Sequence, residues 1–291
     1  MKRFFRQYGR LTLALAAVLA FCAVLPLLFQ QSRSIETGSW GLSFRTEGQP
    51  PAGNASKDAL RRYDAVYLGD ESQKKIYLTF DAGYENGNVE KVVDALNAQG
   101  VPGAFFVLSH LAKANAPLLQ KMVQSGHTVC NHTANHKDMT KCENAQAFAT
   151  ELDTLTQDCA AIGVPVANYY RPPQGRFCEK NLAWAKELGY RTIFWSFAYC
   201  DWDNDKQPDP AAALKNILEH THPGAVILLH PTSATNAEIL PKLLEEWKAQ
   251  GYRFGTLDEL VTREHARREK EANEPQSNYR TKKPSSAKET V

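Results

Sequence analysis

The chain has 291 residues, 43% of them hydrophobic, which is enough to bury the core of one large domain. Lys and Arg number 34 and Asp and Glu 32, so the formal charge is only +2, and no basic stripe interleaved with aromatic residues occurs. This composition excludes nucleic acid as an expected partner, and it disfavours a polyanionic substrate.

Residues 1–31 have the pattern of a signal peptide or membrane anchor. Four basic residues and no acidic one lie among the first ten, and an apolar run follows at residues 11–29. The run is near the length that spans a bilayer, and no small-residue cleavage site precedes the next polar stretch. A retained anchor with its N-terminus in the cytoplasm is favoured over a cleaved signal. The protein is therefore expected outside the cytoplasm, either membrane-anchored or secreted.

The rest of the chain divides into three segments by composition. Residues 32–74 are rich in Gly, Pro, Ser and charge, which is typical of an N-terminal extension that packs on a domain. Residues 75–262 alternate short apolar runs with longer amphipathic stretches and predict an α/β domain built on a parallel sheet or barrel. Residues 263–291 are charged and nearly free of large apolar side chains, which predicts a disordered tail.

Within the domain, nearly continuous apolar runs predict strands that are buried on both faces. These lie at residues 76–81, 104–108, 127–131, 168–171, 192–197, 225–230 and 252–255. Helices are predicted at residues 88–99, 116–125, 145–162, 179–188, 210–220 and 237–249. Glycine is a common helix stop, and Gly100, Gly126, Gly163, Gly189 and Gly251 follow five of these helices at or near their predicted ends.

Polar residues of catalytic type follow several of the predicted strands. The carboxyl ends of parallel strands hold the active site in α/β folds, so these residues are expected to lie close together. They are Asp81, the pair His132 and His136, Arg171, Asp201 and His230.

An acid at the mouth of a buried strand, such as Asp81, could accept a proton from water; the alternative is an Asp that caps a turn before Gly83. Arg171 opens the rigid segment RPPQG, and its guanidinium could hold Asp81 ionised through a two-pronged hydrogen bond. A purely structural turn is the alternative for Arg171.

His132 and His136 form an HxxxH pair, which on a helical turn would place two imidazoles on one face, within reach of one cation. Polar surface or helix-capping residues are the alternative. His230 could act as a general acid if Asp201 holds its other ring nitrogen. Alternatively, the segment around Asp201 is a solvated acidic loop in which Trp202 merely packs.

Five motifs occur together in a familiar order: TFDAG at 79–83, HTANH at 132–136, RPPQG at 171–175, DW at 201–202 and LLH at 228–230. In this set the chain resembles the polysaccharide deacetylase family, carbohydrate esterase family 4, which carries the NodB homology domain. The resemblance implies a distorted (β/α) barrel and a divalent metal, zinc or a similar ion. It also implies hydrolysis of an acetyl group on a polysaccharide.

Site roles are carried over with the resemblance. Asp81 would be the base and Arg171 its partner, with His230 as the acid and Asp201 as the residue that orients it. His132 and His136 would be the metal ligands. The backbone amide near Gln174 would be the oxyanion donor, and Trp202 would contact the substrate.

The first motif departs from the commoner TFDDG, whose second Asp is the third metal ligand, because this chain has Ala82 there. The metal could then bind more weakly, water could fill the position, or Asn135 or Asp138 could replace the ligand. The longer string TFDAGYENG at 79–87 resembles the δ-lactam-biosynthetic de-N-acetylase subgroup, the PdaA type. That subgroup implies deacetylation of peptide-free N-acetylmuramic acid in peptidoglycan, on the way to muramic δ-lactam in the spore cortex.

Two other functions remain open at this point. The same residues could serve a general peptidoglycan or chitin-type deacetylase that acts on N-acetylglucosamine. The loss of a ligand at Ala82 could instead mark a carbohydrate-binding pseudoenzyme. A mere binder, however, would have no chemical use for a base and an acid at separate strand ends.

Overall fold

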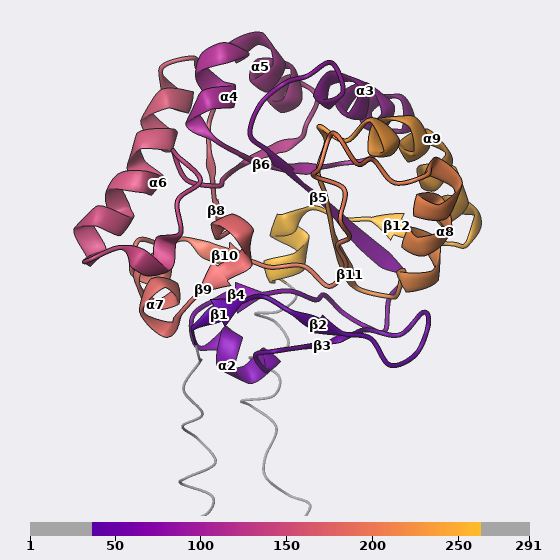
Figure 1. Ribbon diagram of the computed structural model, residues 1–291, viewed down its shortest axis with the longest axis horizontal. Coiled ribbons are helices and arrows are strands. Elements are labelled where there is room, and N and C mark those ends of the chain that lie inside the picture. The colour runs from indigo at the N-terminus through magenta and orange to yellow at the C-terminus, as the bar shows by residue number, and fades with distance from the viewer. Residues whose placement is uncertain (1–36, 263–291) are drawn as a thin grey trace, which may run out of the picture.

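The computed structural model describes residues 37–262 (Figure 1). The predicted anchor at 1–31 and the predicted tail at 263–291 lie outside the described residues. Among the helices in residues 37–262, none is both long and apolar enough to cross a membrane.

A parallel sheet forms the centre of the fold. Within residues 37–262, all neighbouring strands of this sheet are parallel. The strands follow the order β11 (Ala225–Leu229), β5 (Lys75–Ala82), β6 (Ala104–Val107), β7 (Thr128–Asn131), β8 (Ala167–Tyr170), β10 (Arg191–Ile193) and β4 (Ala65–Val66), with β12 (Arg253–Phe254) beside β5.

The segment after β10 crosses from one end of this sheet toward the other. The prediction of a strand at 192–197 is wrong in its second half, because strand pairing with β8 and β4 ends at Ile193. Phe194 still donates its N–H to Val66, but Ser196 donates to Val226 of β11, and Phe197 pairs with Ile227 in the same strand. The sheet is therefore a curled half-barrel of the α/β class.

Helices cover the outer face of the curled sheet (Figure 1). They are α3 (Val89–Gln99), α4 (Ser109–Ala114), α5 (Ala116–Gln124), α6 (Ala145–Ala160), α7 (Glu179–Glu187), α8 (Pro210–His220) and α9 (Ala234–Ala249). The five glycines predicted to end helices all have φ between 63° and 82°. All five have room for a Cβ, so the left-handed backbone rather than lack of space selects glycine there.

Side chains of β5 alternate between the two faces of the sheet. Ile76, Leu78 and Phe80 belong to the large apolar cluster shared with α3 and α9, whereas Tyr77 packs in a second cluster. Asp81 lies on the same face of β5 as Tyr77 and therefore faces the inside of the curl. Ala82 lies on the same face as Phe80 and is buried in the large cluster, which it shares with Val89 and Val107.

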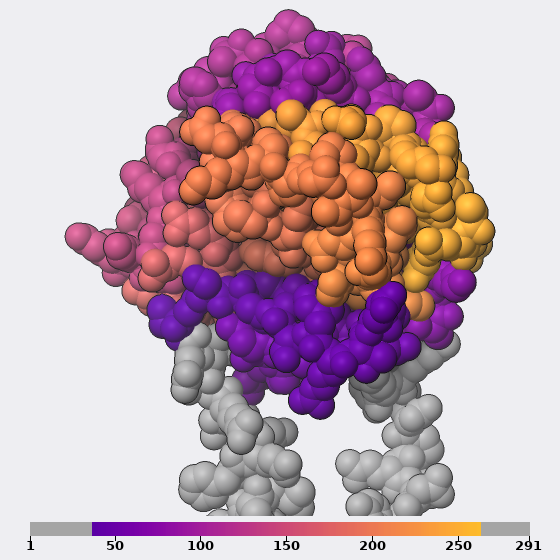
Figure 2. Space-filling model, turned by 45° about the vertical axis from the view of Figure 1, so that its right-hand side comes forward, coloured from indigo at the N-terminus to yellow at the C-terminus, as the bar shows by residue number. Residues whose placement is uncertain are grey.

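Residues 37–64 form a layer along one side of the domain, seen in indigo in Figure 2. The layer contains β1 (Gly38–Ser39), β2 (Leu42–Ser43), β3 (Ala52–Gly53) and α2 (Lys57–Arg61), and β1 pairs with β9 (Arg176–Phe177). Trp40 stacks on Phe194 with ring centroids 4.7 Å apart. It donates its backbone N–H to Gly175 and its Nε1–H to the carbonyl of Trp195, each at 2.8 Å. One residue of the layer thus fixes the backbone at both Gly175 and Trp195.

We expect Trp40→Phe to lower the free energy of unfolding by about 1–3 kcal/mol, because the Trp195 carbonyl loses its donor while an aromatic ring remains against Phe194. Urea titration measures this difference. Phe44, in the same layer and 36% exposed, supplies the control Phe44→Leu, for which a change within about 0.5 kcal/mol is expected. Equal stability of the two variants would show that the indole hydrogen bond contributes nothing.

Candidate active site

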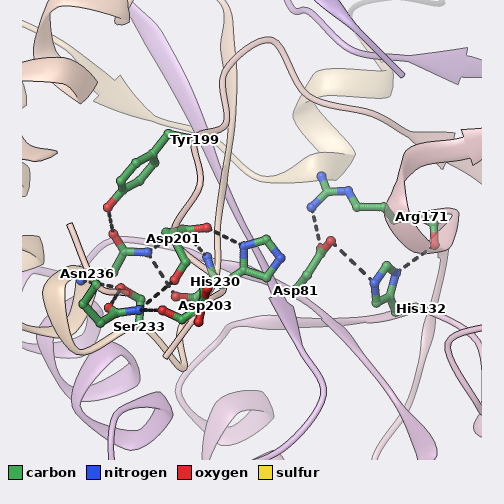
Figure 3. A network of polar contacts seen from close by, with 10 residues as sticks. Asp81, His132, Arg171, Tyr199, Asp201, Asp203, His230, Ser233 and Asn236 are labelled. Carbon is green, nitrogen blue, oxygen red and sulfur yellow. Dashed lines mark hydrogen bonds and ion pairs between the residues drawn. The ribbon is translucent and has the colours of Figure 1, made fainter. Parts of the chain in front are cut away.

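Asp81 and Arg171 form a buried ion pair inside the curl. Asp81 is the last residue of β5 whose side chain faces inward, and Arg171 directly follows β8. The Nη1 of Arg171 donates to Oδ1 of Asp81 at 2.8 Å, and the guanidinium side chain is fully buried (Figure 3). The structure brings these two residues together as expected, but the two-pronged hydrogen bond is wrong, because Nη2 of Arg171 donates to Thr79 instead of Asp81.

Three further groups hold the guanidinium in place. Its Nη2 donates to Oγ1 of Thr79 and its Nε to the carbonyl of Ile193, each at 2.9 Å. Its Cζ also lies over the ring of Phe106, 4.1 Å from the ring centroid. Burial alone would raise the pKa of Asp81, but the charges of Arg171, His132 and His230 together lower it below the ordinary aspartate value. Asp81 is therefore an ionised carboxylate at neutral pH, as a base must be.

His132 and His136 lie in an irregular loop, so the helical turn expected for this pair is wrong. Thr133 and His136 have left-handed backbone angles, with φ of 74° and 54°. The turn is held by Thr133, whose N–H donates to Oδ1 of Asn131 and whose hydroxyl accepts from the N–H of His136. The two imidazole centroids are nevertheless 5.0 Å apart.

The tautomer of His132 follows from its partner. Its Nδ1 lies 2.9 Å from the carbonyl of Arg171, which can only accept, so Nδ1 carries the proton. Burial lowers the pKa of His132 to about 4, and the ring is neutral at neutral pH. Its Nε2 lone pair then lies 3.5 Å from Oδ2 of Asp81, another acceptor. Two facing lone pairs are an arrangement that a bound cation would satisfy.

A second carboxylate, Asp201, holds His230. The ring Nδ1 lies 2.7 Å from Oδ1 of Asp201, and the backbone N–H of His230 donates to Oδ2 at 2.8 Å (Figure 3). Asp201 is only 1% exposed. Burial lowers the pKa of His230, but the hydrogen bond and charge of Asp201 outweigh it and leave the pKa raised. His230 can therefore carry a proton near neutral pH.

Gln174 lies in a tight turn, η2 (Pro173–Gly175), with φ of 58°. A Cβ on Gly175 would come within 2.7 Å of the Trp195 ring, so this position admits only glycine. Both residues line a cavity of about 710 Å³, within the size range of small-molecule sites. Asp81, His132, His136, Trp202 and His230 line the same cavity.

Comparison with known proteins identifies the family. Residues 68–193 match the family described as polysaccharide deacetylase. The chain is also 40% identical over 225 residues to the peptidoglycan-N-acetylmuramic acid deacetylase PdaA of Bacillus subtilis, covering 77% of this chain and 85% of that protein. The chain belongs to the polysaccharide deacetylase family. This deacetylase is accordingly a hydrolase of amide bonds in carbohydrate esterase family 4.

Two further similarities support this assignment. The solved structure of B. subtilis PdaA, a family 4 carbohydrate esterase, aligns with a TM-score of 0.75 at 40% identity, covering 79% of this chain and 98% of that one. An uncharacterized 30.6 kDa protein of Geobacillus stearothermophilus is 43% identical over 224 residues, covering 76% of this chain and 84% of that protein.

Deacetylases of this family generally use a divalent metal, and the two imidazoles fit one. His132 and His136 could hold it, with Oδ2 of Asp81 beside His132. Within residues 37–262, however, no three or more His, Cys, Asp or Glu side chains form a ready-made metal cluster. Ala82 explains part of this, because its methyl group is fully buried among apolar side chains.

The two residues considered as replacement ligands are engaged elsewhere. Asn135 donates its amide Nδ2–H to both carboxylate oxygens of Glu151. Asp138 caps the 3-10 helix η1 (Met139–Lys141) through Thr140 and lies 3.1 Å from Nε of Arg176. Neither lines the cavity, so water or a weaker two-imidazole site is the interpretation that the geometry favours for this deacetylase.

Sequence reasoning missed Tyr84, which lines the cavity at 40% exposure and accepts a hydrogen bond from Nδ2 of Asn204. The YENG string could have revealed it. Glu85 accepts from the N–H of Glu90 in the first turn of α3, and Asn86 donates to the carbonyl of Thr232 at 2.8 Å. The motif thus joins the loop after β5 to the loop after β11 and leaves Tyr84 at the rim.

Proposed function

We propose that this deacetylase removes the N-acetyl group of N-acetylmuramic acid in peptidoglycan strands that lack stem peptides, leading to muramic δ-lactam in the spore cortex. The observation that carries the deacetylation step is a paired carboxylate, Asp81, and a carboxylate-held imidazole, His230, lining one cavity. The similarity to PdaA and the YENG string support muramic acid as the sugar. The proposal places the enzyme outside the cytoplasm, anchored with its N-terminus inside or secreted.

The proposed chemistry uses these groups in sequence. Asp81 accepts a proton from the water whose oxygen attacks the acetamide carbonyl carbon. The backbone amide near Gln174 donates to the oxyanion that forms. His230 then gives its proton to the acetamide nitrogen of the substrate as the bond between this nitrogen and the carbonyl carbon breaks. The products are acetate and the free amine of the sugar. Trp202, 55% exposed on the cavity wall, offers a flat apolar face to a sugar ring.

The protonation states of Asp81 and His230 suit their roles as base and acid. The lowered pKa of Asp81 keeps the base ionised, and the raised pKa of His230 keeps the acid protonated at the same pH. A divalent ion held by His132 and His136 would polarise the acetyl carbonyl and the attacking water.

We expect chelation to stop acetate release and added zinc or another divalent ion to restore it. The full-length chain would be incubated with denuded and with peptide-bearing peptidoglycan, and acetate and muropeptide masses would be followed. His132→Ala should lower the rate at least about 100-fold. His110, exposed on α4 and away from the cavity, supplies the control His110→Ala, with a rate within about twofold of wild type.

The products decide between the candidate functions. Loss of acetyl groups only from muramic acid, and only in denuded strands, supports the proposal. Loss from glucosamine positions would instead identify an N-acetylglucosamine deacetylase. An absence of acetate with every metal and glycan would overturn the proposed activity and favour a carbohydrate-binding pseudoenzyme.

A further inference from the structure

Asp201 is held by a second buried residue, Asn236, in addition to its contacts with His230. Asn236 is 1% exposed and is the third residue of α9. Its Nδ2 lies 2.6 Å from Oδ2 of Asp201 and 3.0 Å from the backbone carbonyl of His230 (Figure 3). One amide group therefore contacts both members of the Asp201–His230 pair.

The orientation of this amide is fixed by chemistry. The carboxylate of Asp201 and the carbonyl of His230 can only accept, so the NH₂ of Asn236 must face them. The amide oxygen, Oδ1, then faces Tyr199, whose hydroxyl donates to it at 2.5 Å. The ring of Tyr199 is stacked on Phe197, with centroids 6.2 Å apart. The hydrogen bond of Tyr199 thus reaches Asp201 through Asn236.

The start of α9 is tied to the loop that carries Asp201. Ser233, the N-cap residue of α9, accepts from the N–H of Asn236 and donates its hydroxyl to Oε1 of Gln207. The amide nitrogen Nε2 of the same glutamine side chain donates to the backbone carbonyls of Asp201 and Asp203. These contacts leave Asn236 little freedom to turn away from Asp201.

We propose that Asn236, oriented by the hydroxyl of Tyr199, is a positioning residue for the general acid: it fixes the carboxylate of Asp201 so that Nε2 of His230 points at the leaving nitrogen. The role rests on the proposed function for its effect on turnover. The geometry itself does not depend on which sugar is deacetylated.

Several charged groups surround His230. Asp201 comes from the loop after β10, Asp81 from β5 and Arg171 from the end of β8, and each affects the pKa of His230. His136, from the loop after β7, is also coupled to His230 by charge. A test must therefore change the donor at Asn236 without moving these groups.

Asn236→Asp is nearly isosteric but replaces the amide donor by a carboxylate that faces Asp201. We expect kcat to fall at least about tenfold near pH 7.5, with KM within about twofold, because the orientation of the acid matters in the transition state. As pH falls, the new carboxyl group takes a proton and can donate again, so the ratio of variant to wild-type kcat should rise. A residue that merely fills space would show neither the loss nor its pH dependence.

Tyr199→Phe provides a second test in case a buried carboxylate prevents folding. It removes one hydroxyl and keeps the stacked ring. We expect a smaller loss of kcat, about threefold or more, and no additional loss when Tyr199→Phe is combined with Asn236→Asp, because both changes act on the same amide. Additive losses would mean that Tyr199 acts by another route.

Asp203→Asn is the matched control, since this carboxylate lies two residues from Asp201 and accepts from the N–H of Asp205 rather than from Asn236. Its kcat should stay within about twofold of wild type. The nitrogen-15 spectrum of histidine in the full-length chain gives a readout without turnover: the Nδ1 proton of His230, assigned from His230→Gln, should shift in Asn236→Asp and stay in Asp203→Asn.

The two readouts separate the two proposals. A wild-type chain that releases no acetate from any glycan overturns the proposed function, while the histidine spectrum still decides the role of Asn236. An unchanged His230 signal, or wild-type kcat across the pH range, in Asn236→Asp would overturn the positioning role.

Discussion

Asp81→Asn should abolish acetate release while leaving glycan binding intact. The asparagine oxygen can still accept from Nη1 of Arg171, and Thr79 and Ile193 continue to hold the guanidinium, so the cavity keeps its shape. An amide cannot take a proton from water, however, and a positioned base contributes about 10²–10⁴-fold to rate. We therefore expect kcat to fall by at least about 10³-fold with little change in the dissociation constant for denuded glycan.

The measurement pairs acetate release with a binding assay on the same glycan preparation. Asp158→Asn is the control, because Asp158 also forms an ion pair, with Lys113 at 2.9 Å, but does not line the cavity. Its kcat should match wild type within about twofold. If Asp81→Asn kept more than about a tenth of wild-type turnover, the base would have to be sought elsewhere in the cavity.

Much of the fold could be predicted because it is encoded locally. Apolar runs that stop at a polar residue marked most strand ends within about two residues, and glycines marked the helix ends. The strand expected at 192–197 was overextended, because Phe194 and Phe197 continue the apolar run after the chain has left β10. Their burial comes from residues distant in the sequence, Trp40 and Phe177 for Phe194 and Ile227 for Phe197, which no local pattern records. The helix at 237–249 was placed three residues late, although Ser233 is a recognisable N-cap.

The candidate site was predictable to the extent that strand ends converge. Topology alone brings Asp81, Arg171 and His230 to one end of the sheet. The proximity of His132 and His136 was also anticipated, but for a wrong reason, because two left-handed residues rather than a helical turn produce it. Asn236 was missed because its partner Asp201 lies 35 residues away, and an Asn in the first turn of a helix carries no local signal of that contact.

Arg171→Met should be the most destabilising single change near the site. The variant removes the partners of Asp81, Thr79 and the Ile193 carbonyl at once and leaves a buried carboxylate unpaired. Breaking a buried pair in this way costs about 3–5 kcal/mol of unfolding free energy. Arg176→Met is the matched control: Arg176 pairs with Asp138 at 3.1 Å but its side chain is 41% exposed, so about 1 kcal/mol or less is expected.

The loss in Arg171→Met should also depend on pH, and its sign follows from Asp81. In the wild type the folded pKa of Asp81 is lowered, so its contribution to stability is present above about pH 4, the unfolded value, and fades as pH falls through the folded value. Without Arg171, burial raises the folded pKa, and the variant then loses stability as pH rises through that raised value. The difference in unfolding free energy from wild type should therefore be larger at pH 8 than at pH 5. Urea titrations at both values that gave equal differences would mean that Arg171 supports the fold through packing on Phe106 rather than through the charge of Asp81.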